Sequence, residues 1–330
     1  MIKGAVTALA LLTLAVAACS AAPASPAPPT LVIVAATPTD VELAPQPAST
    51  GTPRAKEATP TITAAATAAS SAMPTPTASP TPCTSAGEVV AGSFTSATAG
   101  GEHAYRLYLP PCYGDDGHVY PALYLFAGNI HNEGKWDELG IDEAADAAIA
   151  AGEIAPLLIV MPAGGWLADE TSGGPGSYES LVLNELIPHV EATTCAWPDG
   201  AGRAIGGISR GGYWALEIAF RFPEQFASVG GHSAALLDTF AGPDVNPQQT
   251  ALRNDLGDLR VYLDIGENDH VRMNTIRLHE AMAAAGITHE WHSNEGRHDD
   301  AYWSGHVPEY LEWYGETWPL DREGYPLCTE

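Results

Sequence analysis

Apolar and polar positions form two alternating patterns between about residue 88 and residue 316. Short apolar runs that end near Gly or Pro are typical of strands buried in a parallel sheet. Between them lie longer segments with apolar residues at helical spacing. Strands are predicted over 101–110, 120–128, 155–162, 203–208, 226–233, 259–266 and 288–293. Helices are predicted over 137–151, 178–193, 210–223, 271–285 and 305–316.

The alternation of strands and helices predicts an α/β fold with a mostly parallel central sheet and helices on both faces. In such sheets, ligands bind at the carboxyl ends of the strands. The loops at 128–140, 163–178 and 236–255 would therefore shape a binding pocket at that edge.

The N-terminal 82 residues differ from this pattern. Residues 1–19 combine Lys3, a short apolar run and small residues, as a secretory signal peptide does. The apolar run is too short for a membrane-spanning helix. The sequence VAAC at 16–19 resembles the lipobox of bacterial lipoproteins, in which the cysteine becomes the first residue and carries the lipid. We expect Cys19 to be lipidated; ordinary cleavage beside an incidental cysteine is the alternative.

Residues 20–82 are dominated by Ala, Pro, Thr and Ser. Such a segment cannot bury enough apolar surface to offset its loss of entropy on ordering, so we predict a disordered linker. Residues 83–330 then form one domain. We expect this domain to be exported to the cell envelope or beyond, with membrane contact through the lipid anchor only.

The net charge is concentrated in the domain. From residue 83 onward, 11 Lys and Arg stand against 37 Asp and Glu. This excess of negative charge repels nucleic acid and anionic membrane surfaces. We therefore expect no nucleic-acid partner.

Four cysteines remain in the domain if Cys19 is lipidated. An even number in an oxidising compartment favours two disulfides, for which three pairings are possible. We expect Cys83–Cys112, which would close a short N-terminal loop. We expect the second disulfide to be Cys195–Cys328, which would tie the C-terminal tail to the end of a helix.

The stretch GGISRGG at 206–212 places one serine between a predicted strand and a predicted helix. In this context G-x-S-x-G indicates a nucleophile elbow, a strained turn that exposes the hydroxyl of Ser209 and leaves room only for small neighbours. Free N–H groups at the start of the helix favour a developing negative charge, and that of Arg210 would be one oxyanion donor. A tight turn with a structural serine is the alternative.

A nucleophilic serine needs a basic histidine, which in turn needs an orienting acid. In the chain order Ser, acid, His, the candidates are Asp269, just past the strand at 259–266, and His298, in the loop after the last strand. Asp264 and Glu267 are the other candidate acids.

His289, His292 and His306 lie close to His298 in the sequence and raise the question of a metal site. His289 and His292 fall on opposite faces of the predicted strand, so both cannot join His298 on one ion. We expect neither a metal nor a cofactor.

The loop after the strand at 120–128 should supply the second oxyanion donor, through the backbone N–H of Asn129 or Ile130. His131 and Trp136 are candidates for the pocket wall. Trp136 could equally pack at the head of the next helix.

Together, these segments resemble the putative-esterase (esterase D) family of α/β-hydrolases, which includes feruloyl esterases, enterochelin esterases, S-formylglutathione hydrolases and mycolyltransferases. The resemblance implies an α/β-hydrolase fold with Ser209 as nucleophile, Asp269 as acid and His298 as base. Ala127 stands where the family often has His before Gly, and Arg210 where many members have Met. The resemblance covers most of 103–315 and rests on RLYLPPCY, YPALYLFAG, LLIVMP, SYESLVLNELIPHVE, GGISRGGYWALEIAFRFPEQFASVGGHS, LDIGENDH and GRHDDAYW.

The expected activity is hydrolysis of carboxylic esters through an acyl-enzyme. Candidate substrates are feruloyl or acetyl esters of plant walls, siderophores and acyl groups of the cell envelope. An acyltransferase on the same triad, in which an alcohol replaces water, is one alternative. A surface binding module that kept the fold and lost activity is another, which the presence of all three residues disfavours.

Overall fold

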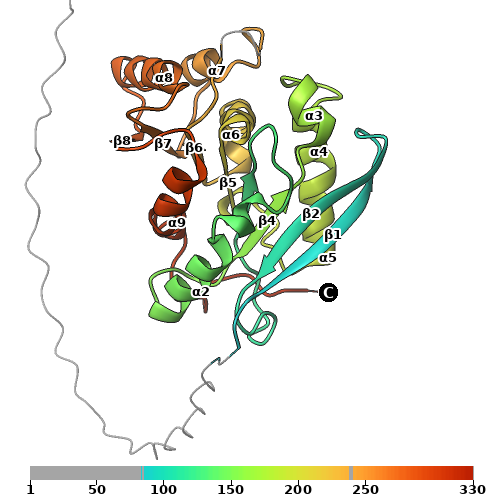
Figure 1. The fold of residues 1–330 in the computed structure, drawn as a ribbon. Coiled ribbons are helices and arrows are strands. Elements are labelled where there is room, and N and C mark those ends of the chain that lie inside the picture. The colour runs from blue at the N-terminus through green and yellow to red at the C-terminus, as the bar shows by residue number, and fades with distance from the viewer. Residues whose placement is uncertain (1–82, 84, 238–240, 330) are drawn as a thin grey trace, which may run out of the picture. The chain divides into compact units, whose positions relative to one another are not determined.

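The computed structural model describes residues 83, 85–237 and 241–329 (Figure 1). The expected signal peptide at 1–19, its lipidation site Cys19 and the expected linker at 20–82 lie outside the described residues. Export and lipidation therefore stay predictions.

One sheet of eight strands forms the centre of the described domain (Figure 1). The strands are β1 (Glu88–Ser96), β2 (Gly101–Leu109), β3 (Ala122–Phe126), β4 (Leu158–Pro162), β5 (Arg203–Ile208), β6 (Ser228–His232), β7 (Arg260–Gly266) and β8 (Glu290–Asn294). Their order is β1-β2-β4-β3-β5-β6-β7-β8. The β1–β2 and β2–β4 pairs are antiparallel and all others are parallel. The predicted α/β fold is confirmed.

Helices cover both faces of this sheet. They are α1 (Lys135–Glu138), α2 (Ile141–Ala151), α3 (Gly165–Glu170), α4 (Tyr178–Leu181), the π-helical turn η1 (Val182–Leu186), α5 (Ile187–Thr193), α6 (Arg210–Arg221), α7 (Pro247–Arg253), α8 (Arg272–Ala284) and α9 (Asp300–Gly315), with short 3-10 turns η2 (Gly200–Gly202) and η3 (Pro223–Gln225). Within the described part of the chain, none of the helices is long and apolar enough to cross a membrane.

Successive strand residues point to opposite faces and divide the core into two layers. Tyr124 of β3 packs in the layer that includes residues of α4 to α8, whereas Leu125 packs in the layer that includes α1, α2 and α9. Every residue of β3, β4, β5 and β6 is buried, which explains their short apolar runs. Burial on both faces gives the loops at the carboxyl edge a rigid base.

Two predicted helices have different boundaries in the structure. The predicted helix at 137–151 is split, because Gly140 takes a left-handed φ of 86° between α1 and α2. The final helix begins at Asp300 and not at 305, because the Asp299 carboxylate accepts the backbone N–H of Tyr302 and caps an earlier start. The partly exposed edge strand β1 and the short helices α3 and α7 were not predicted.

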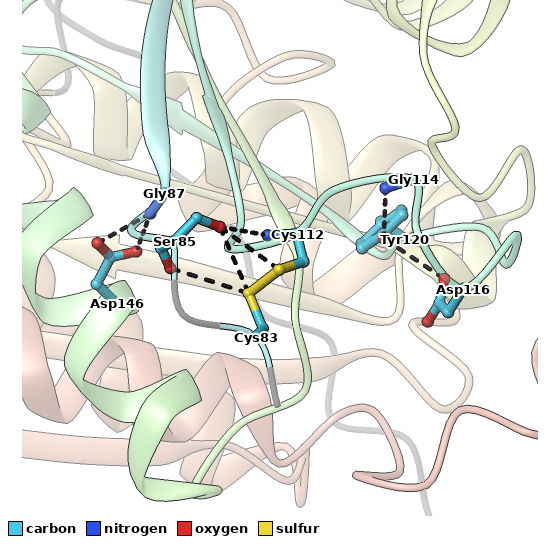
Figure 2. Close-up of a disulfide and its surroundings, with 8 residues drawn as sticks. All are labelled: Cys83, Ser85, Gly87, Cys112, Gly114, Asp116, Tyr120 and Asp146. Carbon is cyan, nitrogen blue, oxygen red and sulfur yellow. Dashed lines mark hydrogen bonds between the residues drawn. A yellow bond between two sulfur atoms is a disulfide. The ribbon is translucent and has the colours of Figure 1, made fainter. Parts of the chain in front are cut away.

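The Cys83–Cys112 disulfide lies at the amino edge of the parallel strands, away from the carboxyl edge. It joins the segment before β1 to the loop after β2, and β2 runs antiparallel to β4. Figure 2 shows that Ser85 accepts the backbone N–H of Cys112 and that the Asp146 carboxylate accepts that of Gly87. These contacts hold the start of β1 against α2.

The Cys195–Cys328 disulfide fixes the C-terminal tail at the same edge. The N–H of Val119 donates to the carbonyl of Pro326 at 3.0 Å, and that of Cys328 donates to Gly117 at 2.9 Å. The tail therefore closes the region just before β3. Both disulfides have the pairing expected from the sequence.

Candidate active site

The turn between β5 and α6 explains why glycines crowd around Ser209. Its φ is 55°, a strained value for a non-glycine residue. Its N–H donates to the His232 carbonyl at 3.0 Å, and its carbonyl accepts the Ala235 N–H at 2.8 Å. A Cβ on Gly207 would lie 2.4 Å from the carbonyl carbon of Gly211. The chain can make this turn only with glycine at these positions, and the turn holds Ser209 at the start of α6.

Three side chains from loops after three different strands meet at the carboxyl edge. His298 Nε2 lies 2.8 Å from Ser209 Oγ, and His298 Nδ1 lies 2.8 Å from Asp269 Oδ2. The Asp269 side chain is fully buried, and its Oδ1 accepts the Val271 N–H at 2.8 Å. The structure thus brings together the three residues singled out in the sequence. In this geometry Asp269 can orient the imidazole while His298 accepts the hydroxyl proton.

The two other candidate acids lie outside this arrangement. Glu267 is exposed, whereas Asp264 is fully buried in β7. Asp264 Oδ2 accepts the Tyr302 hydroxyl at 2.7 Å and the Tyr310 hydroxyl at 2.8 Å. Asp264 Oδ1 lies 2.8 Å from His232 Nδ1. We call these four residues the Asp264 cluster.

The Asp264 cluster contacts the segments that carry Ser209 and His298, which the sequence analysis did not predict. His232 holds the Ser209 N–H through its carbonyl. Tyr302 packs against Gly296, where a Cβ would lie 2.3 Å from Tyr302 Cδ2. The cluster therefore contacts both the nucleophile turn and the loop that carries His298. The sequence feature that could have indicated this cluster is the recurrence of tyrosine along one face of α9.

The side chain of Arg210 turns away from the pocket. Its Nε donates to the Ala168 carbonyl at 2.9 Å, and its guanidinium also donates to the Thr171 carbonyl. The guanidinium carbon lies 4.4 Å from the ring centre of Tyr213 and 5.1 Å from that of Trp214. Arg210 thus fastens the end of α3 to α6, and its charge gives no reason to expect an anionic substrate. Its backbone N–H stays at the helix start, the position expected of an oxyanion donor.

The loop after β3 passes close to the nucleophile. A Cβ on Gly128 would lie 3.3 Å from Ser209 Cβ. The His131 N–H donates to the Gly128 carbonyl at 3.1 Å, which closes a four-residue turn with Asn129 and Ile130 at its centre. Both central residues are exposed. Asn129 and Ile130 therefore stay the predicted source of the second oxyanion donor.

His131 forms part of the pocket wall, as expected. Its ring lies nearly perpendicular to Trp303, which also meets the edge of His298. Burial, and then the charge of Lys135, lowers the pKa of His131. Lys135 itself donates to Asp300 at 2.7 Å and so ties the start of α1 to the start of α9.

Trp136 does not belong to this wall. It is 1% exposed, and its indole N–H donates to the Phe126 carbonyl at 3.0 Å. Of the two alternatives for Trp136, the pocket wall is wrong and packing at the head of the helix is correct, because the side chain lies in the core cluster that includes residues of β3, α2 and α9. The open pocket is lined by residues 128–131, Ser209, residues 298–301 and Trp303.

The histidines weighed as metal ligands are dispersed. His289 lies just before β8, not within it, and its Nε2 is 2.8 Å from His279 Nδ1. His292 stacks on the Tyr262 ring. His306 Nδ1 lies 2.7 Å from the carbonyl of Tyr302, on α9. These contacts account for each ring without a shared ion.

The fold and the serine geometry together define an α/β-hydrolase. The chain belongs to the family described as "Putative esterase", which matches residues 96–314.

Two curated relatives show how far the sequence similarity extends. Esterase Rv1288 of Mycobacterium tuberculosis is 34% identical over 147 residues, which cover 42% of this chain and 31% of that protein. An endo-1,4-beta-xylanase/feruloyl esterase of Xylanibacter ruminicola is 32% identical over 154 residues, covering 44% and 21%. This chain therefore spans less than a third of the length of these relatives.

Solved structures support the fold assignment. A ferulic acid esterase aligns with a TM-score of 0.64 and 24% identity, over 71% of this chain and 98% of that one. The fluorophosphonate-binding serine hydrolase FphF of Staphylococcus aureus aligns with a TM-score of 0.61 and 18% identity, over 69% and 98%.

Proposed function

We propose that this protein is an exported serine hydrolase of carboxylic esters that acts through Ser209, His298 and Asp269. The position of His298 carries the proposal, because its two ring nitrogens lie 2.8 Å from the hydroxyl of Ser209 and from the carboxylate of Asp269. The family match and the relatives named as esterases support it.

In the proposed cycle, Ser209 Oγ forms a bond to the ester carbonyl carbon while His298 Nε2 takes the hydroxyl proton. The N–H groups of Arg210 and of Asn129 or Ile130 stabilise the oxyanion. The bond from the carbonyl carbon to the alcohol oxygen then breaks, and His298 gives its proton to the leaving alcohol. A water activated by His298 attacks the acyl-enzyme, which releases the acid and restores the serine.

For the substrate we propose esters of aromatic acids such as ferulate, linked to a polysaccharide. The rings of His131 and Trp303 and the exposed side chain of Ile130 line the same pocket as Ser209, and they suit a flat, apolar acyl group. The pocket is open, which leaves room for a large alcohol. The name of the Xylanibacter relative, which is 32% identical, supports this class.

Export with a lipid anchor at Cys19 completes the proposal. The signal-like segment at 1–19 supports it, and the two disulfides suit an oxidising compartment. We expect wild-type protein to stay with bacterial membranes after a high-salt wash and Cys19→Ala to be released. Equal retention of the two would contradict the anchor.

Fluorophosphonate labelling of the purified full-length protein, read by intact mass, tests the nucleophile. We expect one adduct on the wild type and none on Ser209→Ala. Rates on methyl ferulate and an acetyl ester would then rank the substrate classes. A folded wild-type protein that takes no label would contradict the hydrolase and favour the binding module.

Hydrolysis and acyl transfer differ in their response to an acceptor. If the protein is a hydrolase, added sugar should leave the rate of acyl release nearly unchanged. A steep rise in total turnover, with sugar ester as the product, would instead indicate the acyltransferase.

A further inference from the structure

His270, which has no role in the proposed cycle, lies beside the catalytic pair. It follows Asp269 directly, and its side chain is 73% exposed. Its ring meets that of His298 nearly edge-on, with ring centres 4.6 Å apart. Asp269, His270 and His298 form a group whose potential metal-ligand atoms, one from each residue, lie within 4.8 Å of one another. Among the described residues, this is the group of three or more His, Cys, Asp or Glu side chains that is close enough to hold a metal ion.

The separations suit a tetrahedral ion. Zn²⁺ binds imidazole nitrogen and carboxylate oxygen at about 2.0–2.2 Å, so neighbouring ligand atoms lie roughly 3.3 Å apart. His298 Nδ1 is 2.8 Å from Asp269 Oδ2, and His270 Nδ1 is 3.8 Å from Asp269 Oδ1. These two contacts are to different oxygens of one carboxylate, and the three potential ligand atoms, one from each residue, lie within 4.8 Å of one another. Because His270 is exposed, its ring can turn toward the carboxylate, and the fourth position can be taken by water.

We propose that Asp269, His270 and His298 bind Zn²⁺, and that the bound ion reversibly inhibits the ester hydrolase. The inference rests on the proposed function, because it assigns a regulator to the same triad. The ion is an inhibitor and no part of the catalytic cycle.

The inhibition follows from the two nitrogens of His298. In the active form Nδ1 carries a proton toward Asp269, and Nε2 offers its lone pair to the hydroxyl of Ser209. An ion on Nδ1 replaces that proton, and the neutral ring must then carry its one proton on Nε2. An ion on Nε2 would occupy the lone pair directly. In both cases no base is left to deprotonate Ser209.

A second imidazole pair provides an internal control. His279 Nδ1 and His289 Nε2 are 2.8 Å apart, and these residues belong to α8 and to the segment before β8. This pair has no contact with Ser209 among the described residues. Zinc bound there should leave ester turnover unchanged.

The test measures ester hydrolysis by the full-length protein against ZnCl₂ concentration, with each variant scaled to its own metal-free rate. We expect wild type to be inhibited and EDTA to restore the rate. His270→Ala should need at least about tenfold more zinc, because it lacks one ligand, and loss of even an outer-shell partner typically lowers metal affinity by about tenfold or more. His289→Ala should match wild type. Mg²⁺, which prefers oxygen ligands, should inhibit none of the three.

Calorimetric titration with ZnCl₂ measures binding without any substrate. We expect wild type and Ser209→Ala to share one site that His270→Ala loses or weakens to the same degree. Equal inhibition of wild type and His270→Ala, or equal binding by both, would overturn the zinc site. If no ester is turned over at all, the proposed function fails, and the calorimetric comparison still decides the metal site.

Discussion

The hydroxyl of Tyr302 donates a 2.7 Å hydrogen bond to the buried carboxylate of Asp264, and this bond joins α9 to β7, the strand that precedes the loop of Asp269. Tyr310 donates to the same oxygen at 2.8 Å, two turns further along the helix. The two hydroxyl groups can therefore be removed one at a time in a matched pair of Tyr→Phe variants. They have the same acceptor and similar geometry, but only Tyr302 packs against Gly296 in the loop of His298.

We predict that Tyr302→Phe and Tyr310→Phe each lower the free energy of unfolding by about 1–3 kcal/mol, because each leaves a buried carboxylate short of one donor. Urea unfolding measures this loss. In addition, kcat should fall several-fold in Tyr302→Phe alone, with KM little changed, since the lost hydroxyl no longer fixes the ring that packs against Gly296 in the loop of His298. Equal kcat values in the two variants would argue against this positioning role.

Asp269→Asn should lower kcat by roughly 10⁴-fold, because an amide next to Nδ1 favours the wrong tautomer of His298. Steady-state kinetics on an activated ester measures the effect. The exposed neighbour Glu267 provides the comparison, and Glu267→Gln should keep wild-type kinetics. If Glu267→Gln were the impaired variant, the assignment of the acid would be wrong.

Gly211→Ala should destabilise the fold by about 3 kcal/mol or more, because the new Cβ would lie 2.2 Å from the Phe126 carbonyl oxygen. Gly305, within α9, has open space around its Cβ position. There the same substitution should stabilise by about 0.5–1 kcal/mol, since alanine is the better helix former. Thermal unfolding of both variants checks the contrast, and similar values would mean that the elbow is less crowded than the structure indicates.

The lowered pKa of His131 predicts that the free energy of unfolding depends on pH. Burial lowers the pKa of His131 in the folded state, so the fold binds its proton less tightly than the unfolded chain does. Its contribution is complete above the unfolded pKa, near 6.5, and is lost as pH falls toward the lowered folded pKa. The stability of wild type relative to His131→Asn should therefore decrease between pH 7.5 and pH 5. Urea unfolding at both values tests this, and a constant difference would mean that the pKa of His131 is not lowered.

The sequence predicted most of the sheet because buried strands leave a clear pattern. The runs around Leu125 and Ile205 are apolar without interruption, since both faces of the sheet are covered. The edge strand β1 is only partly buried, so its composition carried little signal. The early start of α9 depended on the cap by Asp299, which is a single side-chain contact.

The triad residues could be found because each stands after a predicted strand in a fixed chain order. Trp136 could not be placed in the same way, because pocket wall and core both favour a large aromatic residue. The Asp264 cluster was missed for a related reason. Its carboxylate finds hydroxyl donors more than thirty residues away, and such partners are set by how α9 packs on the sheet.

The Cys83–Cys112 disulfide also determines where a mechanical load would enter the domain. A force applied to the chain before Cys83 would be transmitted through the disulfide to the end of β2, which lies between β1 and β4 in the sheet. The edge strand β1, which could otherwise be peeled away one hydrogen bond at a time, is bypassed. If the protein is tethered as proposed, drag from a large polymer would load the sheet at the edge opposite the triad and leave the catalytic geometry undisturbed.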